Sequence, residues 1–267
     1  LTVSNAAEVG GTAGSSTLTV LTPDATTLTV AGGHGSEMNS ASLTAAKATV
    51  INFGGTAKDA NGSDWANAQR VETLSAGELL TLNVDSSQGA RTIDTLTAAK
   101  ITSVTAVGDN AATITDGTTT ALATVSAGTL TGALTIGQGV DLTSSASVTM
   151  GTAADTITLD ILTESNVVVE AGEKSGTDVS DTLKYAGANN QGLTVVDLSS
   201  ATDQVTQING AINSAAQTNF ESVDFSGFSG SFGVNITGST EANTIVGSSN
   251  ADTIVAGEGI DSVTGGD

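Results

Sequence analysis

Three side chains with hard oxygen atoms recur nine residues apart near the end of the chain. They are Asn243, Asp252 and Asp261, and an aliphatic residue follows each of them two places later. Glycines and small polar residues precede each one. Glycine permits the positive φ values of a tight turn and lets backbone carbonyls approach closely. The spacing therefore predicts a series of equivalent turns that present oxygen atoms to a divalent cation.

The nine-residue units occupy residues 238–246, 247–255 and 256–264, and a fourth begins at Gly265. Gly or Ala stands first in each unit, Asn or Asp sixth, and Ile or Val eighth. This pattern resembles the RTX (repeats-in-toxin) nonapeptide, whose idealised form is G-G-x-G-x-D-x-U-x with U a large aliphatic residue. The resemblance implies a calcium-binding β-roll. Calcium suits such turns, because it accepts about six to eight oxygen ligands in irregular geometry.

In the RTX family two units make one coil, which implies that turns eighteen residues apart stack and hold ions between them. Asn243 would then stack with Asp261, and Asp252 would find its partner in a following coil. The resemblance assigns the calcium site to these ligands and turn residues: Asn243, Gly247, Asn250, Asp252, Gly257, Gly259, Asp261 and Asp267.

The units depart from the idealised RTX form. Asn243 stands in place of the aspartate of the first unit, and Glu241 in place of its third glycine. Ser239 and Ser248 replace second glycines, and Ala256 replaces a first one. We therefore expect the first unit to bind calcium weakly or to cap the array, and the aspartates of the next two units to be the main ligands. A solenoid with Asn and Gly ladders and no ion is the alternative.

Three upstream segments carry similar oxygen-rich signals. Residues 150–158 align with the nonapeptide, GTDVSDTL forms a second candidate, and DANGSDW matches the start of a calcium loop without the closing acid of an EF-hand. For each segment the alternatives are a bound ion and an ordinary Asx turn. Their candidate ligands are Asp155, Asp178, Asp181, Asp59, Asn61 and Asp64.

Short runs in which apolar residues alternate with Thr dominate the chain, and such period-two runs predict strands. Aromatic residues make up only 3% of the chain, and 32 residues are glycine. This composition suits thin, stacked strands better than a thick core, because large side chains supply most of the buried area of a compact core. We therefore predict an all-β protein, a parallel β-helix or β-solenoid that ends in an RTX calcium β-roll.

Two segments differ from this pattern. Residues 201–217 are predicted to form one short helix, because Val205, Ile208 and Ile212 follow the i, i+3, i+7 spacing. Four of the five Phe residues lie within residues 220–232. They predict an aromatic plug where the helix crosses the solenoid or, alternatively, an exposed patch that contacts a neighbouring subunit.

We place a soft domain boundary near residue 165. Residues 1–165 read as a Thr- and Ala-rich solenoid, and residues 166–267 continue it with the helix and the nonapeptides from 238 onward. The chain begins within a strand-like run and ends within a nonapeptide, so we expect a piece of a longer protein.

Two short motifs recur at similar offsets. LTAAK occurs at 43–47 and again at 96–100, and SAG occurs at 75–77 and again at 126–128. The offsets predict a repeat of about fifty residues, or two to three coils of a solenoid.

Charge and composition exclude several classes of partner. The formal net charge is −21, from 28 acids and 7 bases, and no base follows Lys184. Nucleic acid and anionic lipid are therefore unexpected partners, because binding to phosphate needs Lys and Arg. The chain contains no Cys, which excludes disulfides and thiolate metal sites. No apolar run is long enough to predict a transmembrane helix.

The combination of an Ala/Thr/Gly/Ser-rich solenoid, no Cys, few bases and an RTX tail resembles the S-layer proteins that Gram-negative bacteria secrete by the type I route. The segment FESVDFSG is similar to the spacers that precede nonapeptides in those proteins. The resemblance implies a structural, non-enzymatic protein of the cell surface. It would fold outside the cell on binding calcium and assemble with further copies of itself into a two-dimensional lattice. A cell-surface polysaccharide is a candidate anchoring partner.

Two other classes stay open. An RTX adhesin would use the solenoid as a stalk or binding module. A β-helix polysaccharide lyase or epimerase would need basic or aromatic groups for substrate carboxylates and proton transfer. The chain offers few of these: His34 is its only histidine, and Trp65 and Tyr185 are isolated in the sequence.

Overall fold

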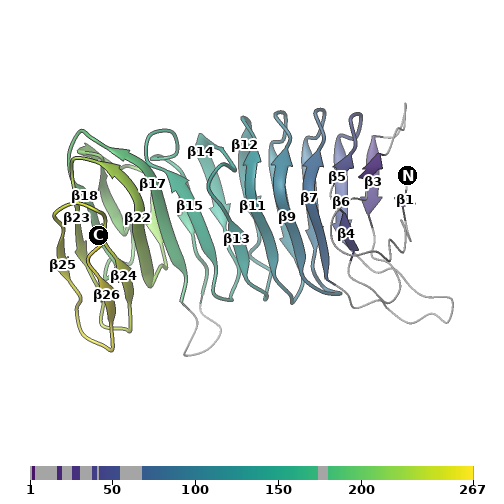
Figure 1. Ribbon diagram of the computed structural model, residues 1–267. Helices are drawn as coiled ribbons and strands as arrows, with labels where there is room; N and C mark the ends of the chain where they lie inside the picture. The colour runs from purple at the N-terminus through teal and green to yellow at the C-terminus, as the bar shows by residue number, and fades with distance from the viewer. Residues whose placement is uncertain are drawn as a thin grey trace. The chain divides into compact units, whose positions relative to one another are not determined.

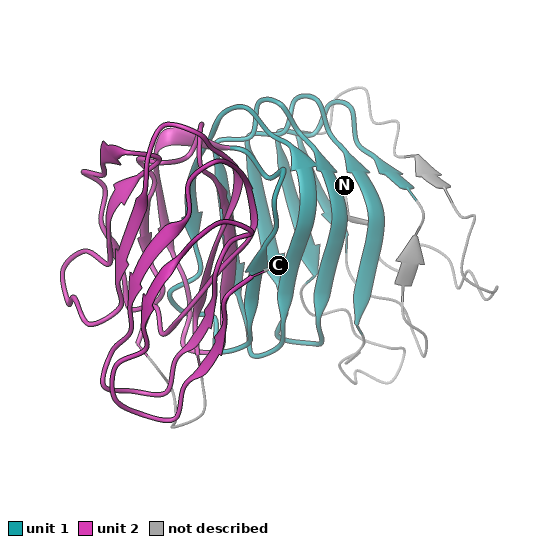
Figure 2. Cartoon of the chain, turned by 60° about the vertical axis from the view of Figure 1, so that its left-hand side comes forward, with its two compact units in different colours: residues 1–141 teal, residues 142–267 magenta. Residues whose placement is uncertain are grey.

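The computed structural model describes residues 2–3, 17–19, 26–30, 38–40, 42–54, 68–173 and 180–266. Within these ranges every regular element is a β-strand. No helix that could cross a membrane is found among the described residues. The prediction of an all-β solenoid with parallel sheets is confirmed. The chain divides into two compact units, Leu1–Asp141 and Leu142–Asp267 (Figure 2).

Unit 1 is a solenoid in which successive strands alternate between two parallel sheets (Figure 1). Partner residues on neighbouring coils are typically about 22 positions apart, as with Gln69 and Arg91. The first sheet contains β1 (Thr2–Val3), β3 (Thr27–Val30), β6 (Val50–Gly54), β8 (Thr81–Asp85), β10 (Ser103–Val107) and β12 (Leu122–Ser126). The second sheet contains β2 (Thr17–Thr19), β5 (Ser42–Thr44), β7 (Gln69–Ser75), β9 (Arg91–Thr97), β11 (Ala112–Thr118) and β13 (Leu134–Ile136), and β4 (Met38–Ser40) pairs with β7.

The core of unit 1 consists of stacked columns of aliphatic side chains. In β8, Leu82 and Val84 point inward and are buried, while the residues between them face outward. The register places Leu82 between Ile51 of β6 and Val104 of β10, both of them buried. Burying each such side chain stabilises the fold by about 1.5–3 kcal/mol. Small aliphatic residues therefore suffice for a core only two sheets thick.

The repeated LTAAK motif marks one corner of this solenoid. Leu43 pairs with Leu74, and Leu74 pairs with Leu96, so the two copies of the motif lie two coils apart. After both copies the chain turns into the first sheet. The SAG match is different, because 75–77 follows a strand of the second sheet whereas 126–128 follows β12 of the first. Only the two LTAAK copies therefore occupy equivalent positions on the solenoid.

Unit 2 contains three sheets. One contains β14 (Leu142–Thr149), β16 (Val168–Glu170) and β21 (Gln217–Thr218). The next contains β15 (Thr156–Asp160), β17 (Thr182–Asn189), β22 (Ser222–Gly230), β24 (Thr244–Val246) and β26 (Ser262–Thr264). The third has the order β20 (Ala211–Ile212), β19 (Val205–Ile208), β18 (Thr194–Asp197), β23 (Val234–Thr237) and β25 (Thr253–Val255).

The helix predicted for residues 201–217 is wrong. β19 and β20 form an antiparallel hairpin in which Ile208 pairs with Ala211. The two residues of its turn, Asn209 and Gly210, have φ values of 49° and 81°. Asn-Gly is the preferred sequence of a type I′ hairpin turn, whose two central residues both need positive φ. This local preference overrides the helical spacing, and Ile212 is accordingly 89% exposed.

An aromatic cluster lies inside unit 2. Phe225 stacks on Tyr185 with ring centroids 5.9 Å apart and meets Phe228 edge-on at 4.9 Å. These three rings and Phe220 are buried, whereas Phe232 is 39% exposed. The predicted aromatic plug therefore exists, although no helix crosses the solenoid beside it. Burial raises the pKa of the Tyr185 phenol, with smaller contributions from nearby carboxylates.

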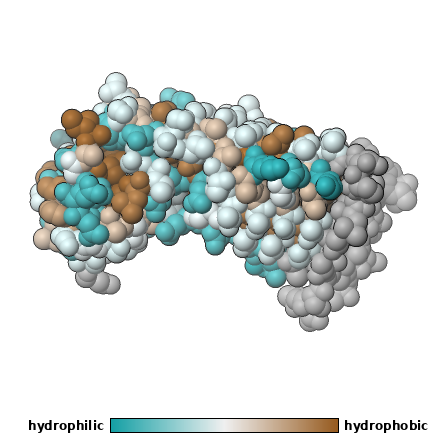
Figure 3. All heavy atoms as spheres, turned by 90° about the horizontal axis from the view of Figure 1, so that it is seen from above, coloured by the Kyte–Doolittle hydropathy of each residue, from teal (hydrophilic) through white to brown (hydrophobic). Residues whose placement is uncertain are grey.

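Hydrophobic residues form only small, separate patches on the face seen in Figure 3, among weakly polar and hydrophilic ones. The outward positions of unit 1 show the reason. Asn52 donates to Thr29 at 3.2 Å, and Asn83 donates to Asn52 at 2.8 Å. Hydroxyl and amide side chains thus form hydrogen-bonded rows along the sheet.

Candidate functional site

The nonapeptide turns stack in the register that the sequence predicts. Thr244 of β24 pairs with Ser262 of β26, and Asn235 of β23 pairs with Thr253 of β25. Both steps span eighteen residues, so two nonapeptides form one coil. The prediction that Asn243 stacks with Asp261 is confirmed. The backbone N–H of Asn243 donates to Oδ1 of Asp261 at 2.9 Å.

Asp252 closes its own turn and contacts the coil before it. Its Oδ2 accepts from the N–H of Ser248 at 2.8 Å, and its Oδ1 accepts from the Ser248 hydroxyl at 2.8 Å. Oδ1 also accepts from the N–H of Val234 at 2.8 Å. Val234 lies eighteen residues earlier, so this contact is made to the preceding coil, and the expected partner of Asp252 in a following coil stays a prediction. Asn250 lies in the same turn, where its N–H donates to the Ser248 hydroxyl at 3.2 Å.

One hydrogen bond defines the nonapeptide turn and also occurs upstream. In units 238–246 and 247–255 the side-chain oxygen of the sixth residue accepts from the N–H of the second. In residues 150–158, Oδ2 of Asp155 accepts from the N–H of Gly151 at 2.7 Å, which is the same pair of positions. The alignment of this upstream segment with the nonapeptide therefore has a structural counterpart.

The structure brings four of the predicted residues together with one that the sequence analysis missed. We call this set the corner column. Each member immediately precedes a strand of the sheet that runs from β15 to β26, and the strands pair in order. The corner column consists of Asp155, Asp181, Glu221, Asn243 and Asp261.

Hydrogen bonds connect the corner column from coil to coil. The N–H of Asp155 donates to Oδ1 of Asp181 at 2.8 Å, and the N–H of Asp181 donates to Oε2 of Glu221 at 2.8 Å. Nδ2 of Asn243 donates to the backbone carbonyl of Glu221 at 2.9 Å. Asp155, Asp181 and Asn243 are at most 2% exposed. Each of these hydrogen bonds therefore joins a side chain of one coil to the backbone of the preceding coil.

Glu221 escaped the sequence analysis because it lies outside any glycine-rich unit. A different signal includes it, although that signal is not specific to the column. An acid or amide followed by Ser or Thr and then an aliphatic residue occurs at every member of the corner column, and also at Glu72, Asp94 and Asp252. Glu221-Ser222-Val223 fits this three-residue signal as well as Asp155-Thr156-Ile157 does.

The stacked turns supply backbone carbonyls at close range. A Cβ added to Gly257, whose φ is 94°, would lie 2.1 Å from the carbonyl oxygen of Ser239. A Cβ on Gly259, whose φ is 113°, would lie 2.6 Å from the carbonyl oxygen of Glu241. Gly247 meets both Oδ2 of Asp252 and the carbonyl of Gly265 in the same way. Only glycine admits this approach. At one edge of the coil it brings the carbonyls of Ser239 and Glu241 close to the stacked turn, and at the other edge it brings a carboxylate of Asp252 and the carbonyl of Gly265 together.

These residues do not form a cluster of acidic side chains around a calcium ion, but their backbone carbonyls could contribute to a calcium site. Among the described residues no group of three His, Cys, Asp or Glu side chains is placed to hold a metal ion. A calcium site here would therefore consist of backbone carbonyls of stacked glycine turns with one carboxylate, which is compatible with the ligand preferences of calcium. The other predicted ligands, Asp59, Asn61, Asp64, Asp178 and Asp267, lie outside the described residues.

No known protein family, curated protein or solved structure matches the chain significantly.

Proposed function

We propose that the protein is a structural protein of an extracellular surface layer, which folds on binding calcium and assembles with copies of itself into a two-dimensional lattice. The observation that carries this proposal is the eighteen-residue stacking of glycine turns at Asn243 and Asp261. A stack of this kind can place carbonyl and carboxylate oxygens of successive coils around an ion.

Electrostatics supports the calcium requirement. Successive members of the corner column lie on neighbouring strands, which are about 4.8 Å apart, and four of its five members are acids. Lys184 is the last base of the chain, and its Nζ pairs with Asp224 at 2.8 Å. The acids that follow Lys184 in the sequence therefore outnumber the bases there, and carboxylates on neighbouring strands favour a nearby cation. A divalent cation that binds only the folded chain would stabilise it by mass action.

The solenoid suits assembly into a layer. Each coil presents similar outward rows of small polar side chains, so lateral contacts can repeat along the molecule. An acidic protein without Cys can also remain unfolded where calcium is scarce and fold where it is abundant. This behaviour fits export followed by folding at the cell surface.

One observation favours a second candidate, an adhesin module. The outward rows of unit 1, such as Thr29, Asn52 and Asn83, offer aligned hydrogen-bonding groups that could recognise a repetitive surface such as a polysaccharide. The two candidates differ in whether the folded chain associates with itself.

Calcium titration of the chain tests the proposal, with circular dichroism and light scattering recorded on the same samples. We expect β-sheet signal to rise cooperatively with calcium, and ordered sheets to become visible by electron microscopy as scattering increases. Folding with calcium but without association would favour the adhesin module. If EDTA changes neither the circular dichroism spectrum nor the stability of the chain, the result contradicts the calcium requirement and therefore the proposal.

A further inference from the structure

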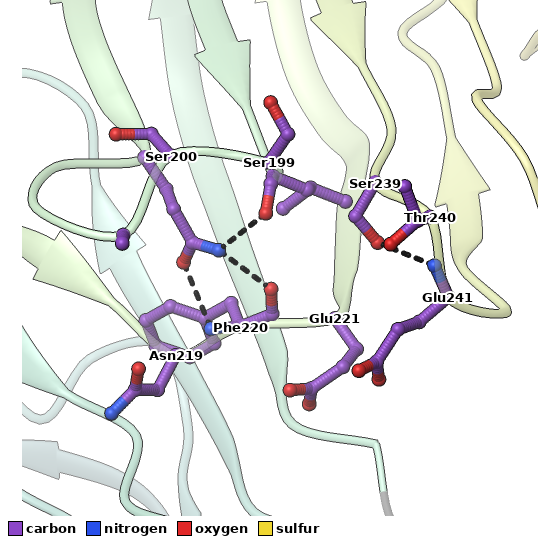
Figure 4. A pocket seen from close by; sticks show the side chains of 11 residues that line it. Ser199, Ser200, Asn219, Phe220, Glu221, Ser239, Thr240 and Glu241 are labelled. Carbon is purple, nitrogen blue, oxygen red and sulfur yellow. Dashed lines mark hydrogen bonds between the residues drawn. The ribbon is translucent and has the colours of Figure 1, made fainter.

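Unit 2 contains a cleft of about 330 Å³ next to the nonapeptides. Three separate segments line it: the turn after β18, the residues just before β22, and the first nonapeptide turn. Figure 4 shows residues of all three segments around the cleft. Its volume is at the lower end of the range for small-molecule sites, about 300–1,000 Å³, so only a small ligand would fit.

The floor of the cleft is held in place by Gln204. Its Nε2 donates to the carbonyls of Leu198 and Phe220 at 3.0 and 2.8 Å, and its Oε1 accepts from the N–H of Phe220 at 2.8 Å. Gln204 and Phe220 are 3% and 2% exposed. The amide therefore joins two of the three segments, so this part of the cleft is held in place before any ligand binds.

Hydroxyl groups and carboxylates dominate the rest of the lining. Ser200 and Thr240 contribute hydroxyls, whereas the Ser239 hydroxyl is engaged with Asn243 and the N–H of Glu241. The side chains of Glu221 and Glu241 extend to the same side of the cleft (Figure 4). None of its eleven lining residues is Lys, Arg or His. The cleft therefore attracts cations and repels anions, and it offers both donors and acceptors to a polyol.

One of the two carboxylates is fixed by the fold. Oε2 of Glu221 accepts from the N–H of Asp181 at 2.8 Å, which ties the base of the cleft to the corner column. Glu241 lies at the exposed tip of the nonapeptide turn, where its own N–H donates to the Ser239 hydroxyl at 3.1 Å. The two acids thus belong to different segments of the lining.

We propose that this cleft binds a cationic amino sugar, with Glu221 and Glu241 facing the ammonium group and the hydroxyls of Ser200 and Thr240 facing the sugar hydroxyls. Charge-assisted hydrogen bonds from an ammonium group to carboxylates are about twice as strong as neutral ones. The free amine is therefore the group that the cleft selects. The proposal concerns a binding site, and it does not depend on calcium-driven assembly.

Isothermal titration of the whole chain with D-glucosamine, in calcium chloride and at constant ionic strength, tests this. N-Acetyl-D-glucosamine and D-glucose are the comparison ligands, because each keeps the ring but lacks the positive charge. We expect millimolar binding of glucosamine that is at least about tenfold tighter than binding of either neutral sugar. Equal binding of the three sugars, or no binding of glucosamine, would overturn the proposal.

Variants locate the site. Glu241→Gln should weaken glucosamine binding about tenfold, because it removes the charge and keeps the shape. Thr240→Val should weaken binding less, and it serves as the second test if the first variant unfolds. Glu72→Gln, which changes an exposed acid of unit 1, is the matched control and should bind normally. Binding that both cleft variants leave unchanged would place the ligand elsewhere and overturn the assignment.

Discussion

The backbone N–H of Asn243 donates to Oδ1 of Asp261, eighteen residues further along the chain and one coil away in space. Both polar atoms of the Asn243 side chain also form hydrogen bonds: Oδ1 accepts from the N–H of Ser239, and Nδ2 donates to the carbonyl of Glu221. An amide is therefore better suited than a carboxylate to this position when no cation is present.

Asn243→Asp should separate stability from calcium affinity. The substitution brings a carboxylate oxygen against the Glu221 carbonyl at a site that is 2% exposed. We expect the free energy of unfolding without calcium to fall by about 1–3 kcal/mol. Because the variant places an aspartate where the idealised nonapeptide has one, calcium should raise its midpoint of urea unfolding more than that of the unmodified chain. Equal calcium shifts in the two proteins would argue against an ion at this turn.

Asp252→Asn tests the closure of the second nonapeptide turn. Both carboxylate oxygens of Asp252 accept hydrogen bonds, so an amide group must point its NH₂ at a donor, either Ser248 or Val234. We expect a loss of about 1–3 kcal/mol in unfolding free energy even in EDTA. Glu258→Gln removes one charge from an exposed residue of the next unit and should be near neutral in EDTA. A loss seen only in calcium would mean that the carboxylate serves the ion alone.

Glu221 is predicted to hold the corner column together. Glu221→Ala leaves the N–H of Asp181 without its side-chain acceptor at a site that is 2% exposed, which costs about 1–3 kcal/mol. Glu221→Gln keeps an acceptor oxygen and should lose less. Hydrogen exchange measured by NMR should show faster exchange of the Asp181 amide in the alanine variant. Unchanged exchange would mean that the contact does not protect this coil.

Much of the fold follows from local patterns in the sequence. Alternation of Leu and Val with Thr predicts the strands, because a two-sheet solenoid buries every second residue of each strand. The nine-residue period predicts the eighteen-residue register of β24 and β26, because each coil needs one turn at each edge. These features depend on spacing alone, and spacing is visible in one sequence.

Other features depend on contacts between distant coils. Glu221 joins the corner column through a step of 40 residues from Asp181, and no period predicts a step of that length. The hairpin of β19 and β20 was missed for a different reason. Its apolar residues also fit a helical period, and only the two-residue Asn209-Gly210 turn, with both φ values positive, distinguishes the hairpin from a helix.

The pair formed by Lys184 and Asp224 should make unfolding free energy depend on pH. Partial burial acts to raise the pKa of Asp224, but hydrogen bonds from Lys184 and Ser226 outweigh it and lower the pKa overall. A depressed pKa in the folded state stabilises the protein above the pKa of the unfolded state, about 3.9, and this stabilisation is lost as pH falls through the folded pKa.

Lys184→Met should therefore lower the unfolding free energy at neutral pH by up to about 1 kcal/mol, the usual size for a partly exposed pair. The difference from the unmodified chain should shrink as pH falls below about 4. Urea unfolding of both proteins at a series of pH values measures this difference in unfolding free energy. Lys100→Met, which breaks the exposed pair with Glu78, is the matched comparison. A difference at Lys184 that stays constant down to the lowest pH would show that lost packing, and not the charge, is responsible.

Gly210→Ala distinguishes the hairpin from the helix that the apolar spacing favours. In a helix this change would stabilise the protein by about 1 kcal/mol, because alanine is the better helix former. In the hairpin it should destabilise by about 1 kcal/mol or more. Gly210 has φ of 81°, and an added Cβ would lie 2.9 Å from the carbonyl oxygen of Gln191.

Gly77→Ala is the control for Gly210→Ala. An added Cβ at Gly77 meets no atom within 4 Å, and its φ lies outside the positive range, so alanine should be neutral or stabilising there by up to about 1 kcal/mol. Thermal unfolding of the two variants gives the comparison directly. A lower melting temperature for Gly210→Ala alone supports the hairpin, because the two changes add the same methyl group and differ in backbone conformation and local space. A higher melting temperature for Gly210→Ala would support the helix and contradict the assignment of β19 and β20 as strands.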